Sequence, residues 1–235
     1  MIWSQAYTEK ITQPSEGLYS YPPSLFMISP FNTRNAGVSV YSKEPSRFEV
    51  LVANLEGYVY SRNYDRYVGS FGLTGSEWVL DYGSGAGRMA QHIAERLSPE
   101  SGRLTCVDVF EAWLDVVRKR LKRYPNVDFK RGEISALDIP DSTYDVVVLH
   151  FVLHHVEQEA RQKNIGVLAN KLKRGGRLFI REPIREGHGT PEREIRQLFS
   201  DAGMSERESH IEKAAFMGAI YSGVFVKTSV PHRES

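Results

Sequence analysis

Residues 79–87, VLDYGSGAG, decide the fold of this chain. An apolar run ends in a carboxylate and opens into glycines at every second position, which is typical of a buried strand leading into a ligand-binding turn. We expect residues 88–97 to form the helix that follows, with its first backbone amides directed at the ligand. The stretch therefore predicts a strand, a glycine loop and a helix around a nucleotide-sized ligand.

Asp81 discriminates between the ligands that such a loop binds. Its carboxylate precedes the first glycine by two residues, where it repels the pyrophosphate of a dinucleotide and attracts a cationic ligand. S-adenosylmethionine (SAM) carries an adenosine, an ammonium and a sulfonium, and has no phosphate. The stretch resembles the first motif of class I SAM-dependent methyltransferases, and within them the small-molecule methyltransferases of types 11 and 25. An oxidoreductase that uses NAD is disfavoured by Asp81.

Strand and helix patterns alternate from residue 77 onward, which predicts a doubly wound, Rossmann-like α/β sheet with helices on both faces. A long helix from about 157 to 173 is expected to end at Gly175-Gly176 in a left-handed cap. Two extended segments, about 206–212 and 219–227, follow with little between them and are expected to pair as an antiparallel hairpin. The resemblance implies the same ending, because class I methyltransferases close their mostly parallel sheet with such a hairpin.

Further cofactor contacts follow the second and third predicted strands. Asp108 ends the second strand, and a carboxylate there can accept both ribose hydroxyl protons. By the resemblance, Glu133 takes the adenine amino group and Ile134 packs on the ring, with Phe110 as a second candidate for packing; the family more often has aspartate at the position of Glu133. The residues expected to hold SAM, and its product S-adenosylhomocysteine, are Asp81, Gly83, Ser84, Gly85, Gly87, Asp108, Val109, Phe110, Glu133, Ile134, His150 and Tyr64.

Three histidines, at the end of the fourth predicted strand and after it, are the candidate catalytic residues. His150 falls at the end of that strand, and His154 and His155 begin the following loop, in a segment resembling the one that passes under the methionine part of SAM. A histidine titrates near neutral pH and can take the proton of an acceptor hydroxyl or amine. The alternative is that His154 or His155 caps the helix starting near Glu157. A metal site is not expected, because no cysteine or further histidine completes a ligand set.

The first 75 residues are expected to form an aromatic-rich cap on a SAM-binding domain spanning 76–230. Eight of the 12 tyrosines lie in this N-terminal part. Residues 48–71 are a candidate lid, since they immediately precede the glycine loop and tyrosine rings can shield a sulfonium from water. Tyr64 is the preferred contact, with Arg62 and Arg66 near enough in sequence to reach the methionine carboxylate. The alternative is that the segment is fixed packing.

Composition narrows the class of protein. The chain has 235 residues, 41% of them hydrophobic, and a formal net charge of +1. This charge balance disfavours nucleic acid and anionic membrane as partners. The single cysteine, Cys106, cannot form an intrachain disulfide. No signal-peptide pattern and no apolar run long enough for a membrane span occur, so we expect a soluble, cytoplasmic protein.

Residues 149–152 bear on the methyl acceptor. Methyltransferases that modify exocyclic amino groups of bases often carry Asn or Asp, Pro-Pro and an aromatic residue after the fourth strand, and this chain has LHFV there. Together with the charge balance, this favours a small-molecule or lipid-like acceptor, with transfer to oxygen or nitrogen expected over carbon. A protein acceptor stays open, as does a non-catalytic SAM-binding or scaffold role on the same fold.

Overall fold

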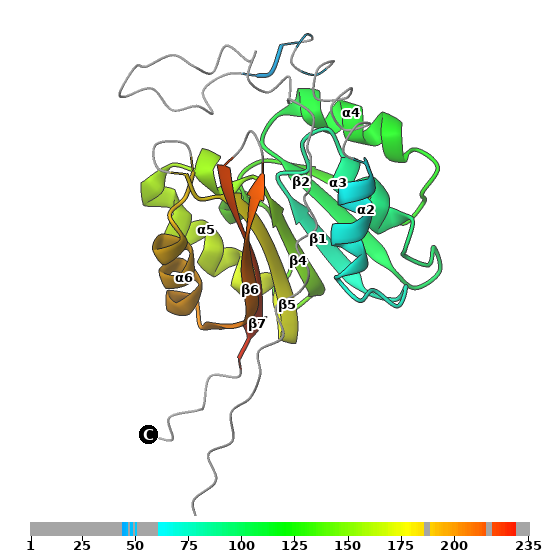
Figure 1. The fold of residues 1–235 in the computed structure, drawn as a ribbon. Coiled ribbons are helices and arrows are strands. Elements are labelled where there is room, and N and C mark those ends of the chain that lie inside the picture. The colour runs from blue at the N-terminus through cyan, green and yellow to red at the C-terminus, as the bar shows by residue number, and fades with distance from the viewer. Residues whose placement is uncertain are drawn as a thin grey trace, which may run out of the picture.

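The computed structural model describes residues 44–46, 48, 50, 61–185, 189–214 and 218–228. Figure 1 shows a seven-stranded sheet with helices on both faces. The strands are β1 (Trp78–Tyr82), β2 (Arg103–Asp108), β3 (Val127–Arg131), β4 (Tyr144–His150), β5 (Leu172–Pro183), β6 (Met204–Ala214) and β7 (Gly218–Lys227). The α-helices are α2 (Ser61–Gly69), α3 (Arg88–Ala94), α4 (Glu111–Leu121), α5 (Gln158–Lys171) and α6 (Glu192–Asp201), and the 3-10 helices are η2 (Ile134–Ala136) and η3 (Leu153–His155).

The sheet has the topology of a class I methyltransferase. Its strand order is β3-β2-β1-β4-β5-β7-β6. The first five strands of the chain run parallel, and β7 pairs antiparallel with both β5 and β6, which confirms the predicted C-terminal hairpin. The chain leaves β1 toward β2 on one side and returns to pair β4 on the other. Ligands of open α/β sheets bind at such a switch point, outside the carboxyl ends of the strands.

Two hydrophobic clusters separate the faces of the sheet. One cluster joins Val68 of α2, Ile93 of α3 and Val117 of α4, and we call this side the α2 face. The other contains Leu168 of α5 and Phe199 of α6, and we call it the α5 face. Because side chains alternate along a strand, each residue at the carboxyl edge is assigned to one face by its neighbours in the strand.

The helix ends differ from the prediction at the turn before β5. The expected cap at Gly175-Gly176 is wrong, because α5 ends at Lys171 and these glycines lie within β5. Leu172 already pairs with Tyr144, and the register then shifts between Tyr144 and Val146. Gly175 has φ +75, so its left-handed backbone serves an irregularity in the strand rather than a helix end.

Helix α2 is fastened to α3. The Arg96 guanidinium donates to the Asp65 carboxylate at 2.6 Å, and Ser61 Oγ lies 3.3 Å from His92 Nε2. Arg96 follows α3, which ends at Ala94 and not at the expected Leu97. Helix α2 is therefore held against α3 and the residues that follow it by polar contacts.

The end of the candidate lid packs into the core. Val68 and Phe71 are fully buried, and the Phe71 ring lies 4.2 Å from that of Phe179 in β5, between ring centroids. This part of residues 48–71 is thus built into the domain. Residues 51–60 of the candidate lid lie outside the described residues, and the lid stays a prediction for them.

Candidate active site

The glycine loop is shaped by its neighbours on one side and is open on the other. Gly83, Gly85 and Gly87 have φ of +76, +50 and +73. A Cβ on Gly83 would lie 2.4 Å from the Val152 side chain, and one on Gly87 would lie 3.0 Å from Val117. At Gly85 the nearest such atom is 4.0 Å away. Positions 83 and 87 require glycine because a Cβ there would crowd a neighbouring side chain. Gly85 leaves room for a ligand to approach the backbone.

Asp81 presents an unsatisfied carboxylate beside this loop. Its side chain is 1% exposed, and Oδ2 has no hydrogen-bond partner among the described residues. Burial, followed by the charge of Asp108, raises the pKa of Asp81 to about 7. A buried carboxylate without donors is stabilised by a cation, and the ammonium and sulfonium of SAM supply that charge. Asp81 thus fits the predicted cofactor.

Asp108 stands at the end of β2 and contacts the glycine loop. Its Oδ2 accepts from the Gly85 amide at 2.9 Å, and its Oδ1 accepts from the Phe110 amide at 3.1 Å. Burial raises the pKa of this carboxyl, while the two amide hydrogen bonds oppose the shift. Each oxygen keeps further acceptor capacity, so the residue can still take ribose hydroxyls as predicted.

Ser84 stabilises the loop through its own strand and the neighbouring one. Its Oγ donates to the carbonyl of Asp81 at 3.1 Å, or of Val107 at 3.3 Å, and its amide donates to Val107 O at 3.0 Å. The side chain is buried. Ser84 therefore shapes the loop, and a direct cofactor contact stays a prediction.

The residues predicted for the adenine differ in availability. Glu133 is exposed, and its Oε2 accepts from Tyr82 Oη at 3.1 Å and from Asn164 Nδ2 at 3.3 Å. Ile134 is fully buried in the cluster of the α5 face, so it offers no surface to a ring. Phe110, at the start of α4 with Val109 before it, is half-buried and is the better placed of the two packing candidates.

His150 lies on the α2 face within an aromatic cluster. Its ring centroid is 5.3 Å from that of Tyr64 and 5.8 Å from that of Tyr67. Burial, assisted by the charge of Arg181, holds the pKa of His150 well below its ordinary value, so the ring is neutral at pH 7. In the part of the chain that the structure describes, neither His150 Nε2 nor Tyr67 Oη has a hydrogen-bond partner. The structure brings Tyr64 and His150 together, and a contact of either residue with the cofactor stays a prediction.

Arg181 connects this cluster to the C-terminal hairpin. Its guanidinium lies over the rings of Tyr67 at 5.5 Å and Phe151 at 5.7 Å, and it forms an ion pair with Glu212 of β6. Phe151 has φ +59, which is strained for a bulky residue, and its amide donates to Arg181 O at 2.8 Å. The backbone is thus forced into an unusual shape directly after His150.

His154 and His155 belong to the other face. His154 Nδ1 lies 2.6 Å from Glu182 Oε2, and the rings of His154 and His155 lie 3.9 Å apart. Helix α5 begins after Glu157 with no side-chain cap, so the helix-capping alternative is wrong for both histidines. His150 thus contacts the tyrosines of α2, whereas His154 contacts Glu182 and His155, so the histidines do not share one set of partners.

Sequence reasoning missed Arg181 and Glu182. Glu182 is a carboxylate near the end of a strand, which is the pattern that singled out Asp81 and Asp108, so a sequence signal was available for it. Arg181 is not a carboxylate and did not match that pattern. The strain at Phe151 has no comparable sequence signal, since phenylalanine rarely adopts a positive φ.

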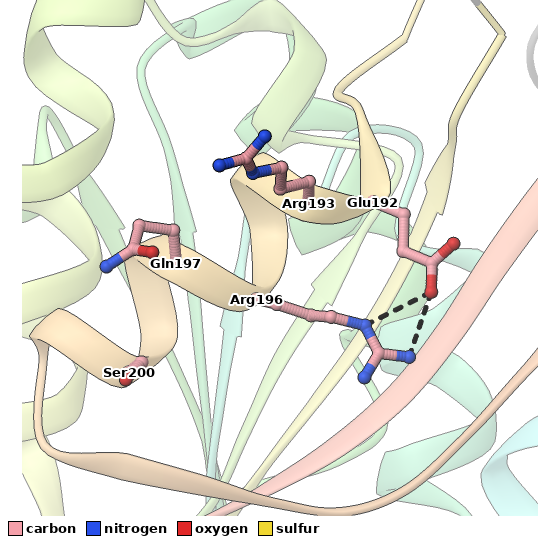
Figure 2. A pocket seen from close by; sticks show the side chains of 5 residues that line it. All are labelled: Glu192, Arg193, Arg196, Gln197 and Ser200. Atoms are coloured by element: carbon pink, nitrogen blue, oxygen red, sulfur yellow. Dashed lines mark hydrogen bonds and ion pairs between the residues drawn. The ribbon is translucent and has the colours of Figure 1, made fainter.

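A separate hollow lies along α6, away from the glycine loop. Figure 2 shows its lining of Glu192, Arg193, Arg196, Gln197 and Ser200. Arg196 is already paired with Glu192 at 2.9 Å and with Glu206 at 2.8 Å, so its charge is neutralised. No group of three or more His, Cys, Asp or Glu side chains in the described part of the chain is placed to hold a metal ion. None of the described helices has the length and apolar character to cross a membrane.

Comparisons of the sequence with known proteins point to one reaction class. A family model described as a methyltransferase domain matches residues 79–176, from β1 into β5. The ubiquinone/menaquinone biosynthesis C-methyltransferase UbiE of Escherichia fergusonii (strain ATCC 35469) is 26% identical over 147 residues, which cover 61% of this chain and 57% of that relative. The chain thus matches little more than half the length of this relative.

Solved structures share the fold. The N-methyltransferase NodS from Bradyrhizobium japonicum WM9 aligns with a TM-score of 0.61 at 19% identity, covering 72% of this chain and 97% of that one. The cyclase SpnF aligns with a TM-score of 0.64 at 14% identity, covering 74% of this chain and 83% of that one. At these identities the likeness shows the fold alone.

The raised pKa of Asp81 predicts a pH dependence of stability. The folded ligand-free protein binds this proton more tightly than the unfolded chain, so the contribution of Asp81 to the free energy of unfolding should fall as pH rises from about 4 to about 7. Asp81→Asn removes the charge. At about pH 8 the free energy of unfolding of this variant should exceed that of the wild type by up to ~4 kcal/mol, and the difference should disappear near pH 4. Urea unfolding at several pH values measures this.

Asp138→Asn is the matched control, since Asp138 is exposed. It should leave the profile of the wild type unchanged. A variant Asp81→Asn that is no more stable than the wild type at alkaline pH contradicts the assignment of a buried, unpaired charge.

Proposed function

We propose that this chain, which is similar to methyltransferases in sequence and in fold, transfers a methyl group from SAM to a small-molecule or lipid-like acceptor. The observation that carries the cofactor assignment is the pair Asp81 and Asp108 around the glycine loop. Asp81 has an oxygen that no donor of the described residues reaches, and Asp108 is fixed by the loop amide of Gly85. A cation and a ribose are the complementary ligand groups.

The residues of the chain have simple tasks in this reaction. SAM supplies a methyl group already activated by the sulfonium, so alignment and exclusion of water provide most of the acceleration. Asp108 would orient the ribose, and Asp81 would attract the cationic end. Phe110 would pack on the adenine. Tyr64 and His150 form the wall of the α2 face next to β4.

The proposed acceptor rests on the sequence after β4 and on the net charge of the chain. LHFV at 149–152 and the net charge of +1 support a small or lipid-like acceptor over nucleic acid. The sequence favours oxygen or nitrogen as the acceptor atom, whereas the relatives named C-methyltransferase favour carbon as the second candidate. The fold is also found in a protein named a cyclase, so a role without methyl transfer is the competing class.

Ligand binding tests the cofactor proposal. SAM and S-adenosylhomocysteine should bind with affinities in the micromolar range, on the order of 8 kcal/mol, and NAD should not bind. Asp108→Ala should weaken binding by roughly 1.5–3 kcal/mol, because ribose hydroxyls lose a charged partner. Calorimetry measures both. Asp128→Ala, at an exposed position of β3, is the control and should bind normally.

Two results contradict this proposal. Tight binding of NAD without binding of SAM removes the methyltransferase assignment. Unchanged affinity in Asp108→Ala removes this residue from the site.

Labelled methyl transfer tests the acceptor class. With SAM that carries a radioactive methyl group, label should enter small-molecule or lipid extracts and not purified protein or nucleic acid fractions, because the site lacks the base-specific motif and a strong positive charge. The position of the methyl group in the product, read by NMR, decides between oxygen, nitrogen and carbon. Label found only in protein supports the protein-methyltransferase alternative, and no transfer to any fraction supports the non-catalytic one.

A further inference from the structure

Glu182 is a buried carboxylate whose hydrogen bonds, within the described residues, all go to the loop after β4. It is 0% exposed at the end of β5. Its Oε1 accepts from the amides of Val152 at 2.6 Å and Leu153 at 2.5 Å. Its Oε2 lies 2.6 Å from His154 Nδ1. Three donors from one short segment therefore offset the cost of burying this charge.

These contacts fix the proton on the His154 ring. A carboxylate oxygen only accepts hydrogen bonds, so Nδ1 has to carry the hydrogen and donate it to Glu182. In a neutral ring, Nε2 is then the nitrogen with the lone pair. The side chain of His154 is 18% exposed, so it is not sealed in the core. It stands at the carboxyl edge of the sheet, where ligands of this topology bind.

His155 does not compete for the same task. Burial, followed by the charge of His154, lowers the pKa of His155 to about 3. The ring of His150 is also held neutral by burial, and it lies on the other face of the sheet. His154, in contrast, has the Glu182 carboxylate 2.6 Å from its Nδ1.

We infer that Glu182 is a positioning residue for methyl transfer, which holds His154 as the tautomer whose Nε2 accepts the proton of the acceptor. The inference rests on the proposed function. A lone pair of the acceptor forms the bond to the methyl carbon, the carbon–sulfur bond breaks, and its electron pair stays on sulfur. The acceptor proton passes to Nε2, and the resulting imidazolium faces the Glu182 carboxylate before it returns the proton to water.

The link to the cofactor loop is steric. Val152, whose amide is held by Glu182, is the residue that packs over Gly83. The same carboxylate therefore sets the position of the SAM loop and the orientation of His154. A purely structural role for Glu182 would require only the two amide hydrogen bonds.

The variant Glu182→Gln separates the two roles. Its amide oxygen can accept from both backbone amides, while its NH₂ group donates toward His154 and requires Nδ1 to be the acceptor. The fold is then kept and the tautomer inverts. Glu212→Gln, a carboxylate of β6 paired with Arg181, is the matched control.

Nitrogen-15 NMR of histidine-labelled protein reads the tautomer without any acceptor. The wild type and Glu212→Gln should show His154 protonated at Nδ1, and Glu182→Gln should show it protonated at Nε2. Diethyl pyrocarbonate reacts with the free lone pair, so modification of His154, mapped by mass spectrometry, should slow about tenfold or more in Glu182→Gln. S-adenosylhomocysteine should slow the same modification in the wild type.

If His154 of the wild type carries its proton on Nε2, the inference is overturned. This test uses the wild type alone, so it applies even if Glu182→Gln fails to fold. An unchanged tautomer in a folded Glu182→Gln also overturns it. If bound S-adenosylhomocysteine does not slow the modification of His154, the ring lies outside the site. This result also overturns the inference. Failure of S-adenosylhomocysteine to bind at all contradicts the proposed function instead, and the calorimetry distinguishes that case.

Discussion

Residue 83 has to be glycine because the side chain of Val152 occupies the space that a Cβ would need, 2.4 Å from the nearest side-chain atom. This contact joins the loop after β1 to the loop after β4. The amide of Val152 is in turn held by Glu182 at the end of β5. The carboxyl ends of three neighbouring strands thus form one packed unit, and interiors packed this closely transmit a displacement from one loop to the next.

Three carboxylates stand at this edge of the sheet and are stabilised in different ways. Asp108 and Glu182 accept hydrogen bonds from backbone amides, which fixes them as parts of the structure as well as of the site. Asp81 has an oxygen that no donor reaches within the described residues, and its pKa is raised to about 7. Ionisation of Asp81 therefore costs the ligand-free protein stability, and a cationic ligand relieves that cost.

The sequence predicts much of this architecture because its signals are local. The glycines of residues 83–87 and the carboxylates Asp81 and Asp108 lie directly next to the strands they follow. The hairpin was predicted for the same reason, from two extended segments with a short connection. The wrong prediction of a helix cap at Gly175-Gly176 shows the limit of such local signals. Glycine is favoured wherever φ is positive, so it does not distinguish an irregular strand from the end of a helix.

The rest of the site depends on contacts between distant segments. Ile134 carries the apolar character expected of an adenine contact, yet the packing of the α5 face buries it fully. His154 is fixed by Glu182, which lies far from it in the chain, so spacing around the histidines could not reveal their orientation. His150 ends β4, whereas His154 lies in the 3-10 helix after it, and sequence spacing alone did not show that the two rings have different partners.

A crystal structure with S-adenosylhomocysteine tests the central claim most directly. The account predicts the ligand at the carboxyl ends of β1, β2 and β4, with the ribose hydroxyls on Asp108 and the amino group directed toward Asp81. The adenine should lie beside Phe110, and the sulfur on the side of the loop that carries His154. Density for the ligand in the hollow along α6, or at the edge of the sheet without contact to Asp108, would contradict it.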